Sequence, residues 1–224
     1  MTQFHDEQTG EPLAFAAADV VLAGYTGRDQ ESVRRHIEEL AEHGVPGPER
    51  VPTFYRATPG LVVADDRIDV LGSETSGEVE FILLRAGGTL YVGLGSDHTD
   101  RGHERVSITH AKQLCAKVVA PGLWRYDDVA PHWDRLVLRS FAGAERRLYQ
   151  EGAVSAMLDP EDILGRVRAR TGLDDLEDVL VFSGTLPLVG ELSCSDRFGA
   201  ELSDEITGRR LSLEYAVNVI EPLD

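Results

Sequence analysis

The order of apolar and polar residues predicts a chain that is rich in β-strands. Residues 60–95 hold four short apolar runs, separated by Gly72 and by the pair Gly87-Gly88. Short apolar runs between turn residues are typical of strands. Further strands are predicted at 12–24, 135–141 and 179–182, and a terminal hairpin is predicted from 198–202 and 209–220 around Thr207-Gly208.

Three stretches have features of helices. Apolar residues recur every three or four positions within 30–43, which predicts an amphipathic helix. Pro160 stands where proline is favoured, near the first position of a helix, and residues 103–115 also have helical character. The elements together predict an α+β fold of mixed sheets with a few short helices. We expect one domain over the whole chain, with residues 1–11 as a flexible N-terminus.

The chain is strongly acidic, which makes polyanionic partners unfavourable. Its 224 residues include 22 basic and 39 acidic ones, for a net charge of −17. We therefore expect neither nucleic acid nor an anionic membrane surface as a partner. An anionic substrate remains compatible, because a metal ion inverts the local sign of the charge. The acidity could also reflect adaptation to salt.

The remaining composition favours a cytoplasmic protein. No run of about 18 apolar residues predicts a membrane span, and the polar, acidic start does not resemble a secretory signal. The two cysteines form neither a disulfide framework nor a metal knuckle. Twenty of the 22 basic residues are arginine, so Lys112 and Lys117 are the only lysines. The motifs of serine hydrolases, P-loop proteins and zinc proteases are absent from the sequence.

Three acidic residues form a candidate metal site. Glu78 and Glu80 are two positions apart on a predicted strand, so both side chains face one side. Asp97 follows after a glycine turn and another strand, a path that can return it to the same end of the sheet. Three carboxylates suit a hard cation such as Mg²⁺ or Mn²⁺. Taken by spacing alone, the solvated face of an edge strand is the alternative.

Other residues could carry chemistry beside such a site. His36 lies three positions before Glu39 on a predicted helix, where a carboxylate can orient an imidazole that acts as a general base. Arg101 could hold a substrate carboxylate, and Lys112 could stabilise an enolate. The alternatives are a surface or boundary pair for His36 and Glu39, a capped turn for the loop that holds Arg101, and an ordinary surface lysine for Lys112. The segment Ser183-Gly184-Thr185 offers backbone N–H groups and a hydroxyl to an anion, or is a simple turn.

The order of these segments resembles that of the fumarylacetoacetate hydrolase superfamily over about 22–220. That family has a glycine-arginine segment followed by His-x-x-Glu on a lid helix, an extended Phe-x-Lys segment, a metal-binding Glu-x-Glu, an Asp-x-x-x-Arg loop, a lysine and a Thr-Gly-Thr-Pro loop. The matching residues here are Gly27-Arg28-Asp29, His36 with Glu39, Phe54-Tyr55-Arg56, Glu78 with Glu80, Asp97 with Arg101, Lys112, and 183–190.

The resemblance implies a β-rich roll that forms homodimers and binds Mg²⁺ or Mn²⁺. It implies Glu78, Glu80 and Asp97 as metal ligands, with His36, Glu39 and Lys112 as catalytic residues. Substrate-binding roles are implied for Arg56, Arg101, Gly184 and Thr185. The chain departs from the family in a shortened segment between Glu80 and Asp97, in Glu104 where a glutamine is frequent, and in an extra residue, Leu186.

The implied activity is hydrolysis of a carbon–carbon bond in an acylpyruvate-type or other β-dicarbonyl acid, through a metal-stabilised enolate. Decarboxylation, hydration or isomerisation of a 2-oxo acid at the same metal site is the first alternative. A binding protein that has kept the fold without catalysis is the second. The substrate is expected to be a small 2-oxo or β-dicarbonyl acid.

Overall fold

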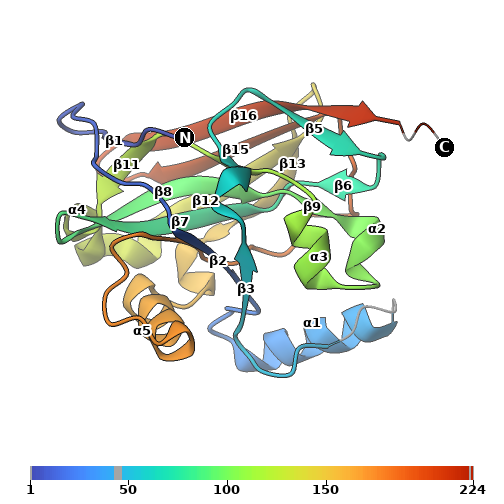
Figure 1. Ribbon diagram of the computed structural model, residues 1–224, viewed down its shortest axis with the longest axis horizontal. Helices are drawn as coiled ribbons and strands as arrows, with labels where there is room; N and C mark the ends of the chain where they lie inside the picture. The colour runs from blue at the N-terminus through green and yellow to red at the C-terminus, as the bar shows by residue number, and fades with distance from the viewer. Residues whose placement is uncertain (1, 43–46, 222, 224) are drawn as a thin grey trace.

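The computed structural model describes residues 2–42, 47–221 and 223, except for the side chains of His36 and Leu40. The largest sheet among these residues has nine strands (Figure 1). The sheet is mixed, because β14 pairs in parallel with β2 and antiparallel with β7. Its main path is β1 (His5–Asp6), β11 (Gly122–Arg125), β8 (Thr89–Asp97), β7 (Val79–Ala86), β14 (Val179–Phe182), β2 (Asp19–Gly24) and β3 (Thr53–Ala57), with β10 (Lys117–Val119) joining β8 to β4 (Val62–Val63).

Two smaller sheets complete the β-structure of the described residues. The five-stranded sheet contains the hairpin β15–β16, and its edge strand β5 pairs in parallel with β16. Its order is β13 (Arg147–Ala153), β12 (Val137–Ala142), β15 (Arg197–Asp204), β16 (Arg209–Ile220) and β5 (Arg67–Leu71). The two-stranded sheet pairs β6 (Thr75–Ser76) with β9 (Thr99–Asp100).

The helices are short and lie mainly on one side of the strands. In the view of Figure 1, α1 and α5 lie below the sheets, while α2 and α3 lie at the end that holds β6 and β9. Every helix of the described residues is too short or too polar to cross a membrane. The α-helices are α1 (Gln30–Glu42), α2 (Arg101–Glu104), α3 (Ile108–Gln113), α4 (Tyr126–Val129) and α5 (Pro160–Thr171), and 3₁₀ turns occupy Pro59–Leu61, Ala130–Arg135 and Val154–Ala156.

Strand β7 is buried on both faces, which explains its nearly continuous apolar sequence. Phe81 and Leu83 contribute to the core between the two larger sheets. Ile82 and Leu84 contribute to a second core on the other face, together with Phe182. Glu80 lies on this second face by strand alternation, so β7 carries a carboxylate into a position that is otherwise apolar.

Several predicted elements are confirmed. The helix expected at 30–43 is α1, the strand at 179–182 is β14, and the terminal hairpin is β15–β16. The flexibility expected of residues 1–11 stays a prediction, and part of this segment packs against the main sheet. Phe4 is buried in a core, and β1 pairs in parallel with β11. An apolar side chain and an available strand edge therefore hold Phe4 and β1 against the sheet.

Candidate metal centre

The three acidic residues predicted to bind a metal lie together where β7 begins and β8 ends. The two strands are antiparallel, with Glu80 opposite Gly95. The backbone N–H of Asp97 donates to the carbonyl of Glu78, at 3.0 Å. One carboxylate oxygen from each of Glu78, Glu80 and Asp97 lies within 4.8 Å of the others. The hairpin therefore brings the third acid back to the first two, as the sequence predicted.

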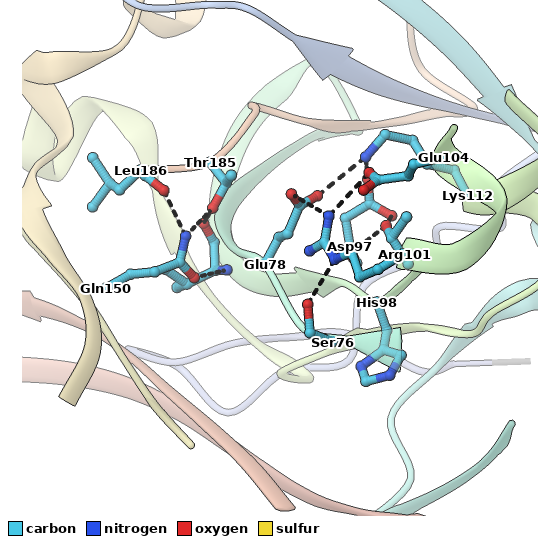
Figure 2. Close-up of polar contacts among 12 residues, drawn as sticks. Ser76, Glu78, Asp97, His98, Arg101, Glu104, Lys112, Gln150, Thr185 and Leu186 are labelled. Carbon is cyan, nitrogen blue, oxygen red and sulfur yellow. Dashed lines mark hydrogen bonds and ion pairs between the residues drawn. The ribbon is translucent and has the colours of Figure 1, made fainter. Parts of the chain in front are cut away.

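Basic residues surround the acids, and Figure 2 shows how they converge. The ammonium of Lys112 donates to Asp97 at 2.5 Å and to Glu78 at 3.1 Å. The guanidinium of Arg101 donates to Glu78 at 3.1 Å and to Glu104 at 3.0 Å. These side chains are mostly shielded from water, since Lys112 has 9% and Arg101 has 12% of its side-chain surface exposed. Each ion pair is therefore screened less than a surface pair.

This environment shifts the pKa values of Asp97 and Glu80 in opposite directions. Burial alone would raise the pKa of Asp97, but the ammonium groups of Lys112 and Lys117 outweigh it and lower the pKa to about 2. Burial, with the charges of Asp97 and Glu78, raises the pKa of Glu80 well above its usual range. None of the described residues forms an ion pair with Glu80. The charge of Lys112 acts on Glu80 but does not outweigh burial and the neighbouring acids, and a divalent cation among the three carboxylates would supply the missing compensation.

A glycine loop forms the wall next to Glu80. The backbone N–H of Gly184 donates to the Glu80 carboxylate at 2.7 Å. Gly184 has φ +88°, and a β-carbon there would lie 2.4 Å from the hydroxyl of Thr26, so only glycine fits. The hydroxyl of Thr185 donates to the carbonyl of Val79 at 2.8 Å. The predicted anion loop thus contacts a carboxylate of the protein itself.

Two buried residues of the site, Gln150 and Lys117, are not among the site residues predicted from the sequence. Gln150 accepts from the N–H of Val79 at 3.0 Å and donates to Thr185 and to the carbonyl of Leu186, both at 2.7 Å (Figure 2). Lys117 contacts Asp97 at 2.7 Å. The one signal for Lys117 in the sequence is the rarity of lysine, and we find none for Gln150.

The next residue after Asp97 points the other way, into a cluster of hydroxyl groups. His98 is bonded to Tyr215 and to Thr75, both at 2.9 Å, and Tyr215 is bonded to Ser96 at 2.8 Å. Burial lowers the pKa of His98 to about 3. His98 is therefore neutral at physiological pH, and its polar atoms are satisfied by neutral partners.

Two tyrosines adjoin the cluster. The ammonium of Lys112 lies 6.0 Å from the centre of the Tyr55 ring. Burial raises the pKa of Tyr25, and the charges of Glu104 and Glu78 contribute to the rise. Tyr25 has φ +56°, a conformation that non-glycine residues rarely adopt and that is frequent at functional sites. The tyrosines give the polar cluster an aromatic border.

The structure does not bring every predicted residue to the cluster. Arg56 follows Tyr55 on β3, so the two side chains face opposite sides of the strand. Its guanidinium pairs with Asp19 at 2.9 Å. Glu39 is exposed on α1, three positions after His36. The side chain of His36 lies outside what the structure describes, so its predicted role stays a prediction.

Comparison with known proteins places the chain in a family. A family model described as a protein of unknown function, DUF2848, matches residues 23–215. The chain belongs to the DUF2848 family. No curated protein matches it.

Solved structures show which fold this DUF2848 member shares. A protein of the fumarylacetoacetate hydrolase family from Yersinia pestis CO92 has a TM-score of 0.66 at 17% identity, over 98% of this chain and 100% of that one. A 2-keto-3-deoxy-D-arabinonate dehydratase complexed with magnesium and 2,5-dioxopentanoate has a TM-score of 0.63 at 16% identity, over 92% and 75%. The 4-oxalocrotonate decarboxylase from Pseudomonas putida G7, complexed with magnesium and adipate, has a TM-score of 0.56 at 11% identity, over 93% and 79%. The predicted fold is confirmed.

Proposed function

We propose that this protein is a divalent-metal-dependent enzyme that hydrolyses a carbon–carbon bond in a small 2-oxo or β-dicarbonyl acid. The observation that carries the proposal is the set of carboxylates on Glu78, Glu80 and Asp97, gathered within 4.8 Å beside the Lys112 ammonium. These three residues would hold Mg²⁺ or Mn²⁺. Either cation, when bound, would act as a Lewis acid toward substrate oxygen atoms.

Basic side chains of the cluster would bind and stabilise an acidic substrate. Lys112 would donate a hydrogen bond to a substrate oxygen on which negative charge develops, a contact that is strong where water is excluded. Arg101 holds Glu78 in place and would add positive charge that attracts the substrate carboxylate. Gly184 and Thr185 fix the Glu80 side of the site through their existing hydrogen bonds.

Hydrolysis also needs a group that takes a proton from water. We assign this role to His36, with an imidazole nitrogen as the proton acceptor. Glu39 follows three positions later on α1, at a spacing that lets its carboxylate orient the ring. A helix that carries the base could close over the substrate and exclude bulk water. We expect the enzyme to be a cytoplasmic homodimer, and light scattering tests the dimer.

A second candidate keeps the same metal site and changes the reaction. Decarboxylation, hydration or isomerisation of a 2-oxo acid needs stabilised negative charge on the substrate, but no water that cleaves a carbon–carbon bond. Structures of this fold include a dehydratase and a decarboxylase that were complexed with magnesium and with small acids. These likenesses support a small acid as the substrate. They do not distinguish hydrolysis of a carbon–carbon bond from the reactions of the second candidate.

Calorimetric titration of Mn²⁺ into chelator-treated protein tests the metal site. We expect saturable binding at one site in the wild type and none in Glu80→Ala. Glu151→Ala is the matched control, because Glu151 is a half-exposed carboxylate on β13 that pairs with Arg139 away from the cluster. Wild-type protein that binds no cation, or a Glu80→Ala variant that binds normally, would remove the basis for the proposal.

Product analysis with a panel of 2-oxo and β-dicarbonyl acids separates the reactions. Two carbon fragments would indicate hydrolysis, and carbon dioxide would indicate decarboxylation. A product isomeric with the substrate would indicate an isomerase, and gain of water would indicate a hydratase. The hydrolytic assignment further requires that His36→Ala lose most of its turnover. A His36→Ala variant with full turnover would contradict it.

A further inference from the structure

Both lysines of the chain end on the same carboxylate. Twenty of the 22 basic residues are arginine, and the two exceptions are Lys112 and Lys117. Lys112 donates to Oδ2 of Asp97 at 2.5 Å, and Lys117 contacts Oδ1 of Asp97 at 2.7 Å. An ammonium is compact, whereas a guanidinium is broad and planar. A chain that otherwise uses arginine thus has lysine at the two positions where two cationic groups fit around one buried aspartate.

The two lysines differ in how firmly they are held. Lys117 lies on β10 directly opposite Asp97 on β8, so neighbouring strands fix the pair. Its side chain has 0% of its surface exposed, and Nζ also donates to the carbonyl of His98 at 2.7 Å. Lys112 lies on the six-residue helix α3, and 9% of its side-chain surface is exposed. Its ammonium donates to both Asp97 and Glu78.

We propose that Lys117 is a positioning residue that holds Oδ1 of Asp97 and so leaves Oδ2 to be offered to a divalent cation bound by the three carboxylates. Lys112 occupies Oδ2 in the structure. It gives up this contact when a cation enters and is then free to reach the substrate. This inference rests on the proposed function, because it requires that the three carboxylates bind a cation. It assigns the positioning of Asp97 to Lys117 and the contact with substrate to Lys112.

The closing experiment compares variants of β10 by Mn²⁺ calorimetry and by thermal unfolding without cation. Lys117→Met removes the donor while keeping most of the volume, and we expect Mn²⁺ affinity to fall about 10- to 100-fold, as when groups that orient metal ligands are removed. Lys117→Gln keeps a shorter donor, and we expect an intermediate loss. Val119→Ala is the control, because it trims a buried apolar residue of the same strand. We expect it to lower thermal stability and leave Mn²⁺ affinity unchanged.

The outcomes separate this inference from the proposed function. Wild-type protein that does not bind Mn²⁺ would overturn both. Glu80→Ala without binding, together with Lys117→Met at wild-type or higher affinity, would overturn the role of Lys117 alone. The role would equally fail if Val119→Ala lost affinity as much as Lys117→Met, since the loss would then follow stability. If Lys117→Met does not fold, Lys117→Gln is compared in its place. A changed electron paramagnetic resonance spectrum of bound Mn²⁺ in Lys117→Gln, with none in Val119→Ala, would support the proposal.

Discussion

Asp97 and Asp204 are both buried at the end of a strand, and the pKa of each is about 2, but they owe this to different partners. Asp97 is held by lysines from two other elements, α3 and β10. Burial would raise the pKa of Asp204, but hydrogen bonds outweigh it. Asp204 accepts from the hydroxyl of Thr207 at 2.5 Å, from the backbone N–H of Ile206 at 3.1 Å and from His132 at 3.0 Å.

The difference separates a structural carboxylate from a candidate functional one. Ile206, Thr207 and Arg209, three of the four described partners of the Asp204 carboxylate, lie within five residues of it, so Asp204 closes the β15–β16 turn on itself. The partners of Asp97 come from distant segments, and they converge with two further acids. Burying several acids together is costly unless cations compensate them. We therefore expect changes near Asp97 to affect ligands and changes near Asp204 to affect stability alone.

The largest effect is expected from Lys112→Met. Loss of a preorganised donor beside developing negative charge lowers turnover on the order of 10²- to 10³-fold. The measurement is steady-state kinetics on the acid that the substrate panel identifies. Arg210→Met is the control, since Arg210 is an exposed basic residue with 61% of its side chain accessible. Turnover within threefold of wild type in Lys112→Met would place the lysine outside the reaction.

A divalent cation should stabilise the fold through the Asp97 cluster. At 100 times its dissociation constant, Mn²⁺ adds about 2.7 kcal/mol to the free energy of unfolding. For a chain of this size the thermal midpoint should rise by about 5–10 °C. The rise should vanish in Asp97→Asn and persist in Asp204→Asn. Equal rises in both variants would mean that the cation binds elsewhere.

The acidic cluster was predictable because its geometry is mostly local. The two-residue period of a strand places Glu78 and Glu80 on one side, and a hairpin returns Asp97. The helix α1 and the strand β14 were predictable for the same reason, since their apolar periodicity is continuous.

The remaining parts of the site depend on contacts between distant segments. Lys117 stands among apolar residues, and only the pairing of β10 with β8 shows that it meets Asp97. Gln150 is one amide on a strand, and its four hydrogen-bond partners come from three other segments. The extended segment at 54–56 gave no indication of which face meets the site, and the structure turns Tyr55 toward Lys112 rather than Arg56.

The stability contributed by Asp204 should depend on pH. Its pKa falls from 3.8 in the unfolded chain to about 2 in the fold, which corresponds to about 2 kcal/mol at neutral pH. Because the folded-state pKa is the lower one, this contribution is fully present well above pH 4 and is lost as the pH falls from 4 toward 2. Urea unfolding of wild type and Asp204→Asn should therefore give free energies that converge as the pH is lowered. Asp65→Asn, at an exposed position, should differ little from wild type throughout. A gap between wild type and Asp204→Asn that stays constant down to pH 2.5 would show that the charge of Asp204 is not what stabilises the turn.

Thr207→Ala should have the smallest effect, because Thr207 is exposed and water can replace part of its hydrogen bond to Asp204. A loss of about 1 kcal/mol in the free energy of unfolding at pH 7 is expected for one such bond. The measurement is urea unfolding, with Ser212→Ala on the exposed face of β16 as the control. Mn²⁺ affinity should stay at the wild-type value, because the turn is held locally and shares no partner with the acidic cluster. A weaker Mn²⁺ affinity in Thr207→Ala would show that the environment of Asp204 influences the metal site at Asp97. It would contradict the view that changes near Asp204 affect stability alone.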